Sequence, residues 1–337
     1  MTAFEQAEQY INEIPRFAGK NTVEDTSRLL TSAGCDRLPF PVIHVAGTNG
    51  KGSVCACLAS ILKESGRRVG IFTSPHLVDI RERIRIDDEM ISENRFTEVF
   101  REVQILAEEG KKEGLSHPSF FEYLFLMAMI YFRDEELKAI IETAHSLRMK
   151  VTAHVYGPEA MQKLAKMGID CMEHGALMDA PTVRVIEKCG TVLVPTFFPY
   201  DVVVSPNPLP SQDHQMSCKL AKYAERLKEG RKHILNSNIK LGYGSDIVFQ
   251  HNNYDCGNEY SCWLRSGTDP FRALKAATSI NAEIIGIKDV GRIEEGAYAD
   301  IAAWSKDILT DHRALMDCAF VMKNGRTYPT ESSLDGQ

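Results

Sequence analysis

The amino-acid sequence predicts an α/β protein with two domains, residues 1–134 and 135–337. Two observations predict this class. A glycine-rich loop at 47–52 lies between a short apolar strand and a helix, and from residue 135 onward helices and strands alternate along the chain. Strands that alternate with helices are typical of parallel sheets, because a crossover between parallel strands needs a helix.

The composition excludes several classes of protein. The chain has 337 residues, of which 44% are hydrophobic and 25% charged, so it can bury a core without disulfide bonds. Its net charge of −7 argues against nucleic-acid and membrane partners. Nine cysteines without a CxxC pair, and an amino terminus without a basic segment, indicate a cytoplasmic protein with reduced thiols. The most apolar run, 120–132, is too short to span a membrane.

The first domain is predicted to contain helices and short strands around the glycine-rich loop. Ser92 and Ser119 are typical helix N-caps, and residues 41–46 (PVIHVA) form an apolar run that favours a strand. The expected helices are 4–13, 23–33, 53–65, 92–110 and 119–132, and the expected strands are 41–46, 68–72 and 83–86. A strand, a glycine loop, a helix and a second strand follow the logic of a βαβ unit.

The second domain is predicted to be half of a (β/α)₈ barrel. Its expected helices are 135–147, 158–167, 180–188, 214–236 and 270–286, and its expected strands are 149–154, 169–174, 190–195 and 239–246. Short strands at 300–304, 319–323 and 326–328 surround Asn324-Gly325, which is a hairpin turn signal. His154, His174 and Asp246 lie at the carboxyl ends of their predicted strands, which is the catalytic face of such a barrel.

The glycine-rich loop is a candidate phosphate-binding site. Its residues are Gly47, Thr48, Asn49, Gly50, Lys51, Gly52 and Ser53. Such a loop presents backbone amides to anionic oxygens, Lys51 can reach the terminal phosphates of ATP, and Ser53 can face Mg²⁺. The spacing differs from GxxxxGK[ST], so a tight turn with a solvated lysine is the alternative.

The surrounding motifs sharpen this interpretation. HVAGTNGKGS (44–53), FTSPHL (72–77), RERIRI (81–86) and SFFE (119–122) resemble the N-terminal part of folylpolyglutamate and dihydrofolate synthases, of the Mur-ligase superfamily. That family uses ATP to join glutamate to a folate. The resemblance implies that Lys51 and the loop amides hold ATP, and that Ser74 and Glu122 hold Mg²⁺. His76 would border the pterin site, or it stiffens its loop through a hydrogen bond. The family's later motifs and its second domain are missing here.

His154, His174 and Asp246 form a candidate metal site, since neutral imidazoles and a carboxylate suit Zn²⁺ or a similar divalent ion. A single histidine at a strand end is more often structural. The flanking segments GIDCMEHG (168–175), LGYGSD (241–246) and GRIEEGAYADIAAW (291–304) resemble the C-terminal part of imidazolonepropionase-like and Xaa-Pro-dipeptidase-like amidohydrolases.

This second resemblance implies hydrolysis of a C–N bond in a small-molecule substrate by a metal-activated water. It implies that His154 and His174 are ligands and that Asp246 is a ligand and the general base. Thr196, Gly175 and Ser245 would shape the backbone, whereas His145 and Glu173 would pack ordinarily. The chain lacks the family's HxH motif and a counterpart of its bridging lysine or glutamate.

The first resemblance ends and the second begins near 133–136, so we interpret the chain as a fusion of a partial P-loop Mur-ligase-type domain with a half barrel and short β-sandwich strands. The favoured function is Mg·ATP binding with two incomplete active sites, because a phosphate loop is local whereas a barrel site draws on all eight strands. Metal-dependent amidohydrolysis and residual folate–glutamate ligation are the alternatives. Open sheet edges predict association into a homo-oligomer.

Overall fold

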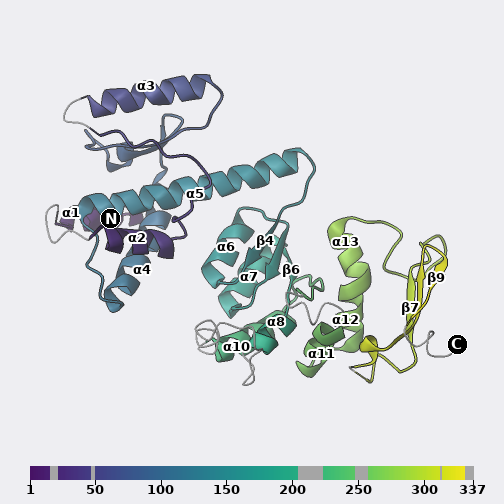
Figure 1. Cartoon of the computed structure of the whole chain (residues 1–337). Helices are drawn as coiled ribbons and strands as arrows, with labels where there is room; N and C mark the ends of the chain where they lie inside the picture. Colours follow the sequence, from purple (N-terminus) through teal and green to yellow (C-terminus); the bar gives the residue numbers. More distant parts are fainter. Residues whose placement is uncertain (16–21, 47–49, 204–222, 247–256, 312, 331–337) are drawn as a thin grey trace. The chain divides into compact units, whose positions relative to one another are not determined.

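A computed structural model describes residues 1–15, 22–46, 50–203, 223–246, 257–311 and 313–330. The chain divides into two compact units, Met1–Glu142 and Thr143–Gln337 (Figure 1). Their mixture of helices and strands agrees with the predicted α/β class. The assignment of domains to 1–134 and 135–337 remains a prediction. In the part of the chain that the structure describes, no helix has both the length and the apolar character needed to cross a membrane.

The first unit is built around four helices that share one hydrophobic core. Thr2 and Thr22 cap α1 and α2 through reciprocal capping boxes, and Ser92 caps α4 as predicted. The helices are α1 (Ala3–Glu13), α2 (Val23–Ser32), α4 (Glu93–Lys112) and α5 (Phe120–Ser146). Their buried side chains include Ile11, Leu29, Phe96, Val103, Tyr123 and Met127. This continuous core holds the helices together through burial of apolar surface.

The strands of the first unit form an antiparallel sheet, contrary to the predicted βαβ unit. Its order is β1 (Gly70–Phe72), β2 (Ile84–Ile86) and β3 (Glu89–Met90), and the helical turn η1 (Ile80–Arg83) precedes β2. The predicted strand 41–46 is wrong, because these residues join no ladder and Val42 and Ile43 are exposed. The strands of a βαβ unit are parallel, whereas β1 pairs in the antiparallel sense with β2.

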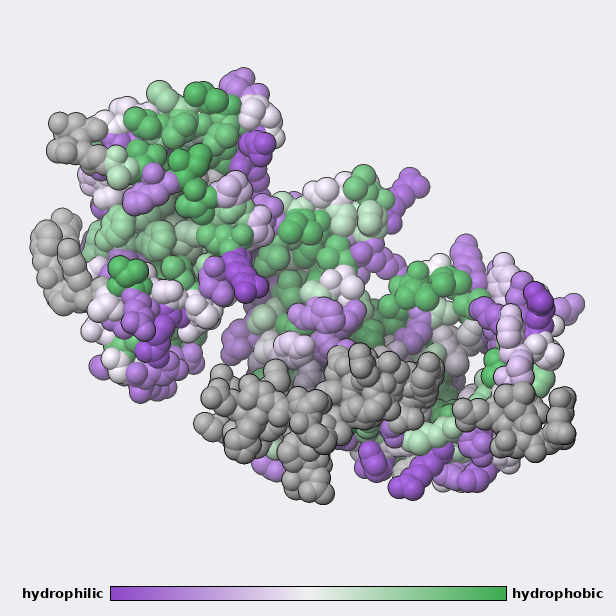
Figure 2. All heavy atoms as spheres, in the orientation of Figure 1, coloured by the Kyte–Doolittle hydropathy of each residue, from purple (hydrophilic) through white to green (hydrophobic). Residues whose placement is uncertain are grey.

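Helix α3 (Lys51–Glu64) follows the glycine-rich loop and has only one buried residue, Ala59. Val54 and Ile61 are among its exposed apolar side chains. Figure 2 shows hydrophobic surface gathered over this helix. The helix itself agrees with the prediction for 53–65.

The two helices predicted at 119–132 and 135–147 are one continuous helix, α5, of 27 residues. The predicted interruption is wrong because no glycine or proline lies between Ser119 and Ser146, and Arg133-Asp134-Glu135-Glu136 contains ordinary helix formers. The place where the two resemblances meet therefore lies inside a regular helix.

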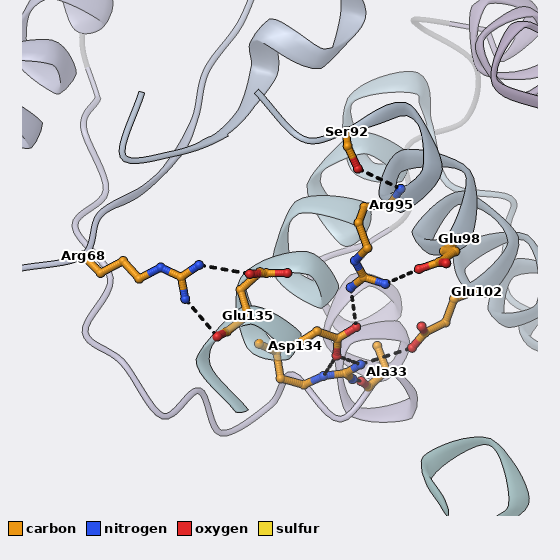
Figure 3. Close-up of polar contacts among 9 residues, drawn as sticks. Ala33, Arg68, Ser92, Arg95, Glu98, Glu102, Asp134 and Glu135 are labelled. Atoms are coloured by element: carbon orange, nitrogen blue, oxygen red, sulfur yellow. Dashed lines mark hydrogen bonds and ion pairs between the residues drawn. The ribbon is translucent and has the colours of Figure 1, made fainter. Parts of the chain in front are cut away.

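A network of ion pairs surrounds this place (Figure 3). The Asp134 side chain is only 1% exposed, and its carboxylate accepts hydrogen bonds from Arg95 at 3.1 Å and from Arg133 at 2.7 and 3.0 Å. Arg133 also donates to the carbonyl oxygen of Ala33 and pairs with Glu102. A buried carboxylate with several charged partners is costly to disturb, because each lost partner leaves an uncompensated charge.

The second unit contains a three-stranded parallel sheet in the order β4 (Thr152–Val155), β5 (Cys171–His174) and β6 (Val192–Val194). Helices α6 (Pro158–Lys166) and α7 (Ala180–Cys189) connect these strands (Figure 1). The predicted strand 239–246 is reduced to a single bridge between Leu193 and Leu241. Its glycines, Gly242 and Gly244, weaken a strand. Among the described residues, the predicted half barrel is thus three strands and one bridge.

The remainder of the second unit is helical and then antiparallel. Its helices are α8 (Phe198–Val203), α10 (Ala224–Leu235), α11 (Gly257–Arg265), α12 (Pro270–Lys275), the π-helical turn η3 (Ala276–Ile280), α13 (Asn281–Ile285) and the short turn η4 (Ala314–Met316). The predicted tail strands form a sheet in the order β7 (Ile301–Trp304), β8 (Cys318–Lys323) and β9 (Arg326–Tyr328). Asn324 and Gly325 both have positive φ at the predicted hairpin turn. Residues 214–222 of the predicted helix 214–236 lie outside the described residues.

Candidate metal centre and phosphate loop

The phosphate loop is described only in its second half. Gly50 is the N-cap of α3 with φ of 77°, and Lys51, Gly52 and Ser53 form the exposed first turn. Gly47, Thr48 and Asn49 lie outside the described residues. The binding of ATP by this loop therefore remains a prediction.

Glu122, a predicted Mg²⁺ ligand, has a structural role in the first turn of α5. Its carboxylate accepts hydrogen bonds from the backbone amide and hydroxyl of Ser119, at 2.8 and 2.7 Å, and from the Thr26 hydroxyl at 3.5 Å. The sequence signal for this role is the S-x-x-E pattern at 119–122. Ser74, the other predicted ligand, is exposed in the loop after β1. The Mg²⁺ assignment of both residues remains a prediction.

The loop before β2 is held by internal hydrogen bonds. Arg83 donates to Nδ1 of His76 at 2.8 Å, which is the loop-stiffening contact considered from the sequence. Glu82 accepts hydrogen bonds from the three backbone amides of residues 77–79, and these amides lower the pKa of its carboxyl group. The loop conformation is therefore fixed by its own side chains.

The parallel pairing of β4 and β5 builds the candidate metal centre. His154 lies directly beside Glu173 in the register, and His174 ends β5. Nδ1 of His154 lies 2.7 Å from Nε2 of His174 and 3.5 Å from a carboxylate oxygen of Glu173. One candidate ligand atom from each of these side chains lies within 4.8 Å of the other two. The His154 side chain is 69% exposed, so the centre is open to solvent.

The other nitrogen of His174 faces a second set of polar groups. Its Nδ1 lies 2.8 Å from the hydroxyl of Thr196 and 3.8 Å from a carboxylate oxygen of Asp246. Tyr156 stacks on the His174 ring with centroids 4.9 Å apart. The His174 side chain is 3% exposed, and this burial lowers its pKa, whereas the charge of Asp246 opposes that shift.

The three predicted ligands therefore lie together: His154 is next to Nε2 of His174, and Asp246 is next to its Nδ1. Glu173, which the sequence predicts to pack ordinarily, also lies beside them. The signal that could have found Glu173 is its register: a residue directly opposite His154 in a parallel pair shares its face of the sheet. Gly175, predicted to shape the backbone, has φ of 60° directly after His174.

A buried carboxylate holds the chain that follows β6. Glu259 accepts hydrogen bonds from the amides of Phe197, at 2.9 and 2.8 Å, and Phe198, at 2.6 Å, and from the Trp263 indole at 2.8 Å. Burial raises the pKa of Glu259 to about 7, although the two amides act in the opposite direction. Because Thr196 directly precedes Phe197, Glu259 anchors the segment that contacts His174.

Comparison with known proteins defines the class. The model of the amidohydrolase family matches residues 89–328, which is more than half of the chain, so the chain belongs to the amidohydrolase family. A crystal structure of an amidohydrolase is 27% identical, with a TM-score of 0.52, over 59% of this chain and 49% of that one. A crystal structure of a Xaa-Pro dipeptidase with methionine in its active site is 26% identical, with a TM-score of 0.54, over 58% of this chain and 49% of that one.

A different family is also similar to part of the chain. The folylpolyglutamate synthase of Arabidopsis thaliana is 41% identical over 133 residues, which are 39% of this chain and 21% of that protein. The chain spans between a fifth and a quarter of the first curated relatives it matches, and about half of the solved ones. The predicted chimera of a folylpolyglutamate-synthase-like region and an amidohydrolase region is confirmed.

Proposed function

We propose that the second unit binds one divalent cation, such as Zn²⁺, and hydrolyses a C–N bond in a small molecule. The observation that carries this proposal is the approach of His154, His174 and Glu173 to within 4.8 Å of one another. Two imidazoles and a carboxylate are a donor set typical of zinc. Membership of the amidohydrolase family supports the type of reaction.

The residues present fit such an ion. The 2.7 Å separation of the two ring nitrogens is that of a hydrogen bond, so one ring donates a proton that a bound cation would replace. A bound cation supplies Lewis acidity for the hydrolysis. His174 is held by Thr196 and by the Tyr156 ring, whereas His154 and Glu173 face solvent, from which a substrate can enter. The general-base role of Asp246 remains a prediction.

The experiment measures zinc content and hydrolysis in the full chain. After equilibration with zinc and removal of the excess, we expect about one zinc ion per chain, and loss of that zinc in His154→Ala and His174→Ala. His233→Ala, on α10, is the matched control and should keep it. Xaa-Pro dipeptides and N-acyl amino acids are suitable first substrates, given the dipeptidase relative. Wild-type protein without zinc contradicts metal binding, and zinc-loaded protein without turnover of any substrate contradicts hydrolysis.

The similarity to folylpolyglutamate synthases favours a second function, the binding of Mg·ATP by residues 47–53. Gly50, which has a left-handed backbone conformation, is the N-cap of α3 and precedes Lys51. This supports the proposal, because the backbone amides of the first helical turn can bind an anion. Titration of ATP with and without Mg²⁺ tests it. Lys51→Ala should weaken binding at least tenfold, and equal affinities would reject the proposal.

A further inference from the structure

We propose that one exposed face of α3, in the first unit, binds the same face of a second copy of this chain, with the two helices antiparallel. Val54, Cys57 and Ile61 form this surface, which we call the α3 face. None of these residues belongs to the candidate metal centre or to the predicted phosphate loop. The surface also differs from the open sheet edges from which the sequence predicts association.

The α3 face presents apolar side chains to solvent. Val54, Cys57 and Ile61 follow one another at spacings of three and four residues, which places them on one side of a helix. Val54 and Ile61 are 48% and 65% exposed, and Cys57 is exposed as well. Figure 2 shows the hydrophobic surface over this helix. A contiguous apolar surface, unlike a single exposed residue, marks a site of interaction.

Another side of α3 attaches the helix to its own unit. The buried and half-buried residues of the helix, which recur at helical spacing, are Cys55, Leu58, Ala59 and Leu62. Lys63, in the last turn, forms an ion pair with Asp88, between β2 and β3, at 2.7 Å. The helix is therefore held by one side, and the α3 face is left exposed.

The charges at the two ends of α3 favour a second copy as the partner. The first turn contains Lys51 and no acidic residue, and its N-cap makes no side-chain hydrogen bond, so this end is positive. At the other end, Lys63 is paired with Asp88, whereas Glu64 is exposed and lies two turns after Cys57 on the same side of the helix. In an antiparallel pair, the Glu64 carboxylate of each chain lies at the positive end of the other helix.

The antiparallel arrangement also matches the apolar side chains. When the first turn of one helix lies beside Glu64 of the other, Val54 of each chain lies beside Ile61 of the other. The two Cys57 side chains then lie near the twofold axis. Ser53 and Ser60 flank Cys57 on the same side of the helix and are small, so the helix axes can approach to about 8 Å. Facing Cα atoms are then within the roughly 4–7 Å that a disulfide bond spans.

The size of the α3 face sets the strength of the association. The helix has 14 residues and is therefore about 21 Å long. One pair of helices of this length buries less than the roughly 800 Å² per partner of a standard interface, and interfaces of that size are weak. We therefore expect a reversible dimer with a dissociation constant of about 10–100 μM.

Sedimentation velocity of the full chain measures this equilibrium, over concentrations from about 1 to 200 μM that bracket the expected dissociation constant. A reducing agent is present, and nucleotide is left out because the first turn of α3 also belongs to the proposed ATP site. Ile61→Glu should weaken dimerisation at least about tenfold, because it places a charge in each half of the apolar contact. Ile105→Glu is the matched control, since Ile105 is 55% exposed on α4, and it should leave the dissociation constant unchanged.

Glu64→Gln tests the charge argument. It should weaken dimerisation by about threefold to thirtyfold, because two symmetric interactions between a carboxylate and a helix end are lost. Far-ultraviolet circular dichroism confirms that each variant is folded.

Cross-linking identifies the face itself. With added diamide, two Cys57 thiols form an Sγ–Sγ bond, and their two electrons and two protons reduce the diamide. We expect a covalent dimer from wild type and from Cys189→Ser, which removes an exposed cysteine of the second unit, but not from Cys57→Ser. A chain that is monomeric at every concentration overturns the inference. A dimer that is as stable in Ile61→Glu, or a cross-link of equal yield in Cys57→Ser, overturns it as well.

Discussion

Removal of Asp134 tests how the chain is held together where its two resemblances meet. The carboxylate accepts three hydrogen bonds from Arg95 and Arg133, and its side chain is almost fully buried. Each charge-assisted bond contributes roughly 1.5–3 kcal/mol. Because Arg95 and Arg133 keep Glu98 and Glu102 as partners, we expect Asp134→Ala to cost less than the sum, about 3–5 kcal/mol.

The assay is urea unfolding of the full chain followed by two signals. Both tryptophans, Trp263 and Trp304, belong to the second unit, so their fluorescence reports that unit, whereas circular dichroism reports both. With a urea dependence of about 2 kcal/mol per M, a cost of about 4 kcal/mol lowers the midpoint by about 2 M. We expect this shift in the circular dichroism transition of the first unit.

Glu142→Ala is the control, since Glu142 pairs with Lys138 on the exposed surface of the same helix and should contribute less than about 1 kcal/mol. Asp134→Asn keeps the shape of the side chain and removes only its charge, so it should be destabilising too. A midpoint for Asp134→Ala equal to that of Glu142→Ala would refute the buried-network argument.

Three further predictions concern single side chains. Burial raises the pKa of Glu259 from 4.5 to about 7, so the folded state binds this proton more tightly than the unfolded state does. The free energy of unfolding should therefore fall by about 3 kcal/mol as the pH rises from 4.5 to 7. Glu259→Gln should remove this pH dependence, and an unchanged pH profile in that variant would contradict the prediction. Gly230→Ala should destabilise by roughly 2 kcal/mol or more, because a methyl group there overlaps the carbonyl oxygen of Ala176, and thermal unfolding checks this. Glu122→Ala should cost about 0.5–2 kcal/mol without Mg²⁺, as loss of a helix cap does; a change seen only with Mg·ATP would instead support the metal role.

Local signals in the sequence predicted most of the elements. Ser92 is the N-cap of α4, and Asn324-Gly325 forms the turn between β8 and β9. Both could be predicted because capping and turn chemistry depend only on neighbouring residues. The strand at 41–46 failed for the opposite reason: its apolar pattern is correct, but a strand forms only beside a partner elsewhere in the chain. The helix α5 was divided in the prediction because the resemblances change there, although the residues themselves contain no helix breaker.

The sequence points to residues of the candidate metal centre but not to their arrangement. His154, His174 and Asp246 follow from their places at the ends of predicted strands. The positive φ of His174 has no signature in the sequence, and neither has the orientation of its ring, which places Nε2 2.7 Å from His154 and Nδ1 3.8 Å from Asp246. The position of Glu173 beside His154 depends on the exact register of β4 with β5, which hydrophobic patterns do not fix to a single residue.

X-ray absorption at the zinc edge of the zinc-loaded chain tests the central claim most directly, because the chain also has nine cysteines that could bind zinc elsewhere. We predict one zinc ion per chain with a first shell of nitrogen and oxygen atoms at about 2.0–2.2 Å, including imidazole scattering. A shell containing sulfur at about 2.3 Å, or the same spectrum from the His154→Ala variant, would contradict the account.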